Sequence, residues 1–242
     1  MAEQVKPYNP SESKKRQVSQ MFNRIAPYYD FLNRFLSLGI DTIWRKKAIQ
    51  LLKSDHPKVV LDVATGTADV AIEAAKRLQP EKIIGVDISN EMLEIGRSKV
   101  SKRGMDTIIS LEEGDSENLP FQDNTLDAIT VAFGVRNFEN LEKGLEEMFR
   151  VMKPGGKVVI LEFSQPQTFP FKQLYNFYFR NILPLIGKIT SKDPKAYRYL
   201  YESVQAFPDG ERFTSILEKI GFKSNQCIPL TLGVCSIYTG TK

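Results

Sequence analysis

The sequence predicts an open α/β fold, in which helices cover both faces of a mostly parallel sheet. From about Pro57 onward, short β-rich runs alternate with helical stretches, which is the pattern of consecutive βαβ units. The last two expected strands are separated only by Pro229 to Thr231, so they must be antiparallel. A chain of 242 residues with 42% hydrophobic content suits one sizeable core. We therefore expect one α/β domain over residues 57–242, preceded by a helical cap over residues 1–56.

The elements can be placed from the apolar runs and the residues that punctuate them. The strands are expected at residues 58–63, 82–86, 107–112, 126–133 and 157–162, followed by the antiparallel pair at residues 222–229 and 231–239. The helices are expected at residues 68–78, 89–102, 141–152 and 210–220. Ser89 suits an N-cap, and Gly221 suits a C-cap. The run Pro154-Gly155-Gly156 is expected to end the third helix.

Two further helical segments are expected outside the βα units. The cap should lie over the carboxyl edge of the sheet, because its apolar residues recur on one face: Phe22, Ile25, Tyr29, Leu32, Phe35 and Leu36. A helical insertion is expected at about residues 164–207. It is rich in aromatic residues: Phe169, Phe171, Tyr175, Phe177, Tyr178, Phe179, Tyr197, Tyr199 and Tyr201. This insertion is either packed core or the wall of a channel for a long apolar ligand.

Composition excludes several classes of protein. The apolar runs are far below the roughly 18 residues of a spanning helix, and the N-terminus has no apolar signal core. We therefore expect a cytoplasmic protein. Two cysteines, Cys227 and Cys235, lack metal-type spacing, and the single histidine, His56, cannot build a zinc site. Metal and redox chemistry are consequently not expected.

Positive charge gathers near the N-terminus, although the formal net charge is only +4. The basic residues there are Lys6, Lys14, Lys15 and Arg16. We expect a solvated, flexible arm. An arm that docks on an anionic membrane surface stays open as the alternative, since a basic segment suits anionic lipid at least as well as nucleic acid.

The most informative run is residues 59–69, a buried strand that ends in a turn of small residues and enters a helix. Ligands of open α/β sheets bind at such carboxyl ends, where Gly66 permits a close approach of the backbone to the ligand. A dinucleotide fingerprint would need further glycines, but the loop has Ala68 and Ala71 in their place. A phosphate cradle is therefore not expected, and NAD is disfavoured.

Acidic residues follow the next two strands. Asp87 ends the second strand, where its carboxylate can accept hydrogen bonds from both hydroxyls of a ribose. Asp115 and Ser116 follow the third strand and can read an adenine ring through a side-chain acceptor and a backbone N–H. The three strand tips together predict a site for a phosphate-free nucleoside such as S-adenosylmethionine. With the closing antiparallel pair, they match the Rossmann-like fold of class I S-adenosylmethionine-dependent methyltransferases.

Three stretches carry a resemblance to a known family. Residues 29–37 with Trp44, residues 132–137, and residues 150–156 resemble signatures of the ubiquinone/menaquinone-biosynthesis C-methyltransferases. The likeness extends from about Met21 to Tyr238. It implies methylation of a ring carbon of a membrane-dissolved, prenylated quinol, with 2-demethylmenaquinol converted to menaquinol. Matched position by position, the family's cofactor contacts fall on Thr67, Asp87, Asp115 and Ser116.

The resemblance also has departures. Asp41 stands where the family usually has a histidine, Ala68 replaces a second glycine, and Ala132 replaces a serine found in some relatives. We therefore do not expect histidine to be the general base. Arg136 is expected to stabilise a developing phenolate, because a cation within about 4–6 Å favours the ionised form, and Asn137 to orient the same oxygen.

Several alternatives stay open. Tyr29, Asp30 or a water held by Arg136 can take the proton, while Arg136 and Asn137 can instead be a structural pair. A benzoquinol of the ubiquinone pathway can replace the naphthoquinol. An RNA or DNA amine methyltransferase is disfavoured, because Ala132-Phe133-Gly134-Val135 stands where those enzymes carry an N/D-P-P-aromatic turn. A cofactor-binding module without catalysis is the last alternative. We expect no nucleic-acid partner, and peripheral contact with the inner face of the membrane.

Overall fold

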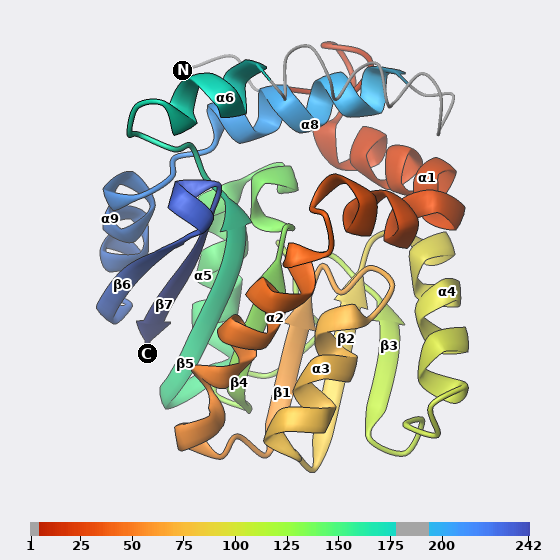
Figure 1. Cartoon of the computed structure of the whole chain (residues 1–242). Helices are drawn as coiled ribbons and strands as arrows, with labels where there is room; N and C mark the ends of the chain where they lie inside the picture. The colour runs from red at the N-terminus through yellow and green to blue at the C-terminus, as the bar shows by residue number, and fades with distance from the viewer. Residues whose placement is uncertain (1–4, 178–193) are drawn as a thin grey trace.

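The computed structural model describes residues 5–177 and 194–242 of the chain, and a seven-stranded sheet runs through it (Figure 1). The strand order is β3-β2-β1-β4-β5-β7-β6. The strands are β1 (Val59–Val63), β2 (Lys82–Asp87), β3 (Ile109–Glu113), β4 (Leu126–Ala132), β5 (Met152–Phe163), β6 (Lys223–Leu230) and β7 (Cys235–Thr241). Strands β1 to β5 are parallel, and β7 is antiparallel to both β5 and β6. The predicted fold class is confirmed.

The helices divide into those of the βα units and those outside them. The first group is α3 (Asp69–Leu78), α4 (Asn90–Ser101), α5 (Leu141–Val151) and α9 (Glu211–Ile220), each within one residue of its predicted bounds. The second group is α1 (Lys14–Leu36), α2 (Ile40–Gln50), α6 (Phe171–Phe177) and α8 (Pro194–Ala206). Short 3-10 turns complete the list: η1 (Lys53–Asp55), η2 (Val135–Asn137) and η4 (Thr231–Gly233).

Two apolar cores cover the two faces of the sheet. On one face α2, α3 and α4 pack against the sheet, with Ile49, Ala71 and Leu93 in a single cluster. On the other face α5 and α9 do the same, with Leu145 and Phe213 fully buried. Alternate residues of each strand face opposite sides, so both faces of a central strand must be apolar.

The cap prediction was right for α1 and incomplete for α2. Helix α1 lies beyond the carboxyl ends of the parallel strands, as do α6 and α8 (Figure 1). Helix α2 instead runs down one face of the sheet, because Trp44, Ala48 and Ile49 form a buried apolar stripe that joins the core. The division into a cap and a separate domain stays a prediction.

Several predicted strand boundaries differ from the structure, most of all at β5 and at the closing hairpin, while β3 begins two residues later than predicted. Strand β5 begins at Met152, before the Pro154-Gly155-Gly156 run, because Gly155 and Gly156 hydrogen-bond Lys242 at the end of the chain. The closing hairpin has a longer connection than predicted, since η4 intervenes before β7 begins at Cys235. A register shift between Leu126 and Ala128 absorbs the irregular start of β5.

The aromatic insertion is helical where it is described, in α6 and α8. Tyr175 and Tyr199 are buried, whereas Phe169 and Phe177 are exposed. Tyr178 and Phe179, which belong to the predicted insertion, lie outside the described residues. Within residues 5–177 and 194–242, no helix combines the length and the apolar character that crossing a bilayer requires.

Gly96 provides a test of how closely α4 packs on the sheet. A Cβ atom there would lie 2.8 Å from Cδ1 of Leu111 and 3.3 Å from the carbonyl oxygen of Gly66. Alanine normally stabilises a helix interior relative to glycine, but overpacking a core costs about 1–3 kcal/mol. We expect Gly96→Ala to lower the free energy of unfolding in a denaturant titration. Ser98→Ala, exposed on the same helix, is the control and should be neutral or slightly stabilising; equal stability of both variants would contradict this packing.

Candidate active site

The carboxyl ends of β1, β2 and β3 meet at one edge of the sheet, and Asp87 ties the first two together. Its Oδ2 accepts a hydrogen bond from the Gly66 amide at 2.8 Å, and its Oδ1 accepts one from the Ser89 amide at 2.8 Å. Gly66 has a φ of 53°, a conformation that favours glycine. The loop after β1 is therefore held open by a carboxylate at the tip of β2.

Burial sets the electrostatics of this edge. It raises the pKa of Asp87 to about 6, although the two backbone amides favour the ionised form. Asp62, beneath the loop, also has its pKa raised to about 6 by burial. The hydroxyls of Thr65 and Thr130 donate to its carboxylate at 2.6 and 2.7 Å. Asp62 thus supports the loop from inside the core, and Asp87 presents a half-buried carboxylate at its surface.

A pocket at these strand tips is lined by several charged residues, for which we call it the polar pocket. Gly66, Asp87, Asp115 and Ser116 all line it, so the structure brings together four of the five predicted cofactor-binding residues. Its volume is about 60 Å³, whereas ligand pockets usually measure about 300–1,000 Å³. The amine of Lys15 in α1 spans it, with Nζ 2.7 Å from Oδ2 of Asp115. The Lys15 side chain therefore has to move before a nucleoside can reach Asp115.

Thr67, the fifth predicted cofactor-binding residue, has its side chain elsewhere. Its hydroxyl donates to Oδ1 of Asp30 at 2.6 Å and accepts a hydrogen bond from Lys99 at 3.1 Å. Only 2% of Thr67 is exposed, and it is not among the described residues that line the polar pocket. The left-handed Ala68, with a φ of 65°, turns the loop there. In this arrangement Thr67 fastens the loop to α1 and α4 rather than facing a ligand.

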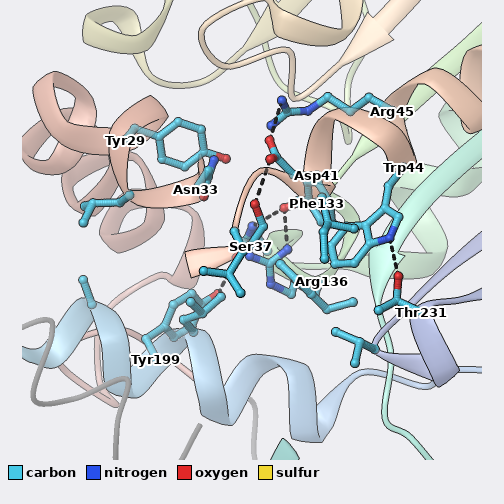
Figure 2. Close-up of a pocket in the computed structure, with 18 of the residues that line it drawn as sticks. Tyr29, Asn33, Ser37, Asp41, Trp44, Arg45, Phe133, Arg136, Tyr199 and Thr231 are labelled. Atoms are coloured by element: carbon cyan, nitrogen blue, oxygen red, sulfur yellow. Dashed lines mark hydrogen bonds and ion pairs between the residues drawn. The ribbon is translucent and has the colours of Figure 1, made fainter. Parts of the chain in front are cut away.

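A second, larger pocket adjoins the first and is mostly apolar. Its volume is about 480 Å³, and its walls come from α1, α2, α6, α8, η4 and the ends of β4 and β5. Trp44, Phe133 and Phe163 form one wall, with the rings of Phe133 and Phe163 4.6 Å apart and Trp44 6.3 Å from each. Figure 2 shows Trp44 fixed by its hydrogen bond to Thr231, at 2.8 Å. Four residues line both pockets: Phe22, Tyr29, Phe133 and Asn137.

Arg136 is a buried cation in the wall of the apolar pocket. Its Nη1 lies 2.7 Å from Oε1 of Glu162, and the two side chains are 7% and 0% exposed. Nη1 also donates to the carbonyl of Phe133 at 2.5 Å. Its Nε is buried with no hydrogen-bond partner among the described residues. An unsatisfied buried donor is costly, so this atom is suited to an oxygen of a ligand.

Asn137 follows Arg136 in η2 and is held from both sides. Its Nδ2 donates to the carbonyl of Phe133 at 3.2 Å, and its Oδ1 accepts a hydrogen bond from the Tyr199 hydroxyl at 3.1 Å. Phe133 has a φ of 58° at the end of β4, and this turn presents its carbonyl to both side chains. The two predicted catalytic residues therefore lie together where the pockets meet.

The candidate proton acceptors differ in position. Tyr29 lines both pockets, and burial raises the pKa of its hydroxyl, so the group stays protonated at neutral pH. Asp30 is 2.8 Å from Nζ of Lys99 and lines neither pocket among the described residues. Asp41, at the family's histidine position, is buried and accepts from Ser37 at 2.7 Å and Arg45 at 2.8 Å (Figure 2). Tyr29 therefore carries its proton at neutral pH, and Asp41 is engaged by Ser37 and Arg45.

Sequence reasoning missed two charged groups of this site. Glu162 was placed at the end of a predicted strand without a role, although a carboxylate in an apolar run signals a buried partner. Lys14 was assigned to a flexible arm, and that prediction was wrong. It is 7% exposed, and its Nζ donates to the carbonyls of Arg136 and Phe138 at 2.8 and 2.9 Å. Burial lowers its pKa to about 8.

The sheet order and the ligand edge define a class of enzyme, the class I S-adenosylmethionine-dependent methyltransferases. A solved S-adenosylmethionine-dependent methyltransferase of Thermotoga maritima has the same fold, with a TM-score of 0.64 and 20% identity. The match covers 92% of this chain and 99% of that one.

Sequence comparison gives the family. Residues 10–242 match the model of the ubiE/COQ5 methyltransferase family, and this chain belongs to that family. It is 51% identical to the demethylmenaquinone methyltransferase of Bacteroides fragilis, over 99% of this chain and 98% of the relative. It is 47% identical to the ubiquinone/menaquinone biosynthesis C-methyltransferase UbiE of Geotalea daltonii, over 95% and 97%. The enzyme class and the family resemblance predicted from the sequence are confirmed.

The pKa of Asp87 leads to a prediction about the affinity for S-adenosylmethionine. Its pKa of about 6 means that the anion is lost as the pH falls below this value. We expect the affinity for S-adenosylmethionine to weaken between pH 7 and pH 5 in the parent protein. Asp87→Asn should bind at least tenfold more weakly at pH 7 and lose that pH dependence in calorimetry. Asp123→Asn, an exposed acid at the far end of β4, is the control; parent-like binding by Asp87→Asn would refute the role.

Proposed function

We propose that this enzyme methylates a ring carbon of demethylmenaquinol with S-adenosylmethionine and so forms menaquinol. The observation that carries the proposal is the pair of adjoining pockets. One is polar and holds the half-buried carboxylate Asp87, the other is apolar and holds the buried cation Arg136, and four side chains are common to both. The full-length similarity to a protein named demethylmenaquinone methyltransferase supports the same substrate.

Binding of the adenosyl group is assigned to the strand tips. Asp87 accepts hydrogen bonds from the ribose hydroxyls, the Gly66 backbone allows close approach, and Asp115 with Ser116 reads the adenine. Lys15 has to leave Asp115 when the nucleoside enters. Thr67 contributes by holding the loop through Asp30. The bound cofactor supplies a methyl group already activated on sulfonium, so the chain has to align the acceptor carbon and exclude water.

Activation of the quinol is assigned to Arg136 and Asn137. Arg136 lines the apolar pocket, and its guanidinium, whose Nε has no partner among the described residues, stabilises a ring oxygen as it ionises, which raises electron density on the adjacent carbon. Asn137 orients that oxygen, and the protonated Tyr29 is a second donor. The ring carbon then bonds to the methyl group as the S–CH₃ bond breaks, and the ring proton leaves to a base or water. We assign no metal to this reaction.

The apolar pocket offers an aromatic wall to a quinol ring, and the similarity to a protein named demethylmenaquinone methyltransferase supports a naphthoquinol. The wall formed by Trp44, Phe133 and Phe163 suits such a ring, since aromatic rings pack favourably at centroid distances of about 4.5–7 Å. A benzoquinol of the ubiquinone pathway is the second candidate, because the similar protein of Geotalea daltonii is named for both pathways. We further propose that the enzyme works in the cytoplasm, in peripheral and transient contact with the inner face of the membrane, because a prenylated quinol is dissolved in the bilayer.

The role assigned to Arg136 leads to a prediction about turnover. Arg136→Ala would leave Glu162 buried without its cation, and breaking a buried pair costs about 3–5 kcal/mol. The sharper variant is Arg136→Met combined with Glu162→Gln, which removes both charges. We expect it to fold, to keep its S-adenosylmethionine affinity within about twofold, and to lose at least tenfold in kcat with a demethylnaphthoquinol.

The pH profile separates catalysis from structure. Without the cation the substrate hydroxyl ionises only at higher pH, so the loss of kcat should shrink as the pH rises. Arg136→Lys keeps a cation opposite Glu162 and is the control. Parent-like turnover by the double variant would exclude Arg136 from the chemistry, and a loss that is constant with pH would limit it to a structural role.

A further inference from the structure

Exposed apolar side chains gather at one end of this molecule. Among the described residues, eight large apolar side chains are exposed. They belong to α1, α2, α6, η4, the α1–α2 turn and the turn before α6. They are Tyr28, Phe31, Leu38, Ile43, Phe169, Phe171, Phe177 and Leu232. Helices α1 and α6 lie beyond the carboxyl ends of the parallel strands (Figure 1). The apolar surface therefore lies at the end of the molecule that holds the apolar pocket.

Three of these side chains form the mouth of the apolar pocket. Leu38, Phe171 and Leu232 line it, yet they are 85%, 37% and 60% exposed. They come from the α1–α2 turn, α6 and η4, three segments far apart in the sequence. We call these three residues the rim. Side chains that both line a pocket and face solvent mark its opening.

The two leucines of the rim have an unfavourable backbone conformation and an unfavourable exposure to water. Leu38 has a φ of 52° and Leu232 a φ of 59°, the left-handed region that costs a non-glycine residue about 1–2 kcal/mol. Both also expose a large apolar side chain to water. Glycine or asparagine would satisfy backbone and solvent at once. Strained and exposed residues at the mouth of a site indicate contact with something absent from the isolated chain.

The size of the apolar pocket indicates what the rim contacts. A volume of about 480 Å³ accommodates a drug-sized head group. A polyprenyl tail of more than a few units must leave through the rim. Exposing that tail to water costs about 0.8 kcal/mol for each CH₂ group. The tail therefore stays in hydrocarbon only if the rim itself reaches the hydrocarbon of a bilayer.

Charge around the rim suits an anionic lipid surface. Arg34 is exposed four residues before Leu38, and Lys172 is exposed next to Phe171. On α2, exposed Lys46 follows exposed Ile43 by one turn. Basic groups that flank inserted apolar side chains are the pattern of interfacial binding. The N-terminal basic residues fit less well, because the amines of Lys14 and Lys15 are engaged within the protein.

We propose that the rim is a lipid-docking surface: Leu38, Phe171 and Leu232 insert into an anionic bilayer, and the substrate tail passes between them without crossing water. The proposal rests on the proposed function for the identity of the tail. Docking itself requires no substrate, and it can therefore be tested separately.

The test uses asparagine, which tolerates the left-handed backbone. Leu38→Asn with Leu232→Asn should raise or preserve the melting temperature and leave the affinity for S-adenosylmethionine unchanged. It should reduce co-sedimentation with phosphatidylglycerol-containing vesicles at least fivefold, without substrate present. The matched control is Gln79→Asn, an exposed residue with a φ of 50° at the end of α3, which should pellet like the parent. Equal pelleting of parent and double variant would overturn the proposal.

Two further measurements separate the proposals. Ile43 is exposed but lies outside both pockets among the described residues. Ile43→Asn should slow methylation of a prenylated quinol in vesicles and leave a tail-less quinol in buffer unaffected. Failure of the parent to methylate either quinol would refute the proposed function and leave the vesicle result standing. Sedimentation showing a parent dimer, a monomeric double variant and no vesicle binding would instead identify the rim as a contact between copies and overturn the docking proposal.

Discussion

The buried ion pair between Arg136 and Glu162 is the constraint on which the rest of the site depends. A guanidinium cannot be held in an apolar wall without a compensating anion, because desolvation of an unpaired charge costs several kcal/mol. Glu162 at the end of β5 supplies that anion, and the carbonyl of Phe133 supplies a second acceptor. Lys14 adds a further link, since its amine binds the Arg136 carbonyl and so fixes α1 over the same turn. The cap therefore has one defined position relative to the cation.

Because α1 is fixed in this way, a single helix forms walls of both pockets. Tyr29 and Phe22 face the polar and the apolar pocket alike, while Lys15 bridges to Asp115. Asp30 in turn reaches Lys99 on α4. Movement of these α1 side chains on nucleoside entry consequently also changes the quinol side of the site. Cofactor and quinol binding are expected to be coupled through this helix rather than independent.

Sequence reasoning located the strand tips because the period of apolar residues and the direction of parallel strands are local properties. Gly66, Asp87 and Asp115 follow from them directly. Thr67 did not, because its hydroxyl is engaged by Asp30 of α1 and Lys99 of α4. Lys14 did not either, since its burial depends on contacts with residues more than a hundred positions away. The exposure and strain of the rim leucines have no signature in the sequence, where leucine indicates core.

Water exclusion connects these features. Methyl transfer from a sulfonium requires a dry boundary between the two pockets. On the polar side α1 supplies the cover, through side chains such as Tyr29. On the apolar side the described residues leave the rim open. Its two leucines have a left-handed backbone and expose apolar side chains to water, and both features are unfavourable for leucine. If the bilayer covers that opening, the lipid surface completes the active site. The exposed apolar end of the molecule and the buried cation then both serve a site from which water is excluded.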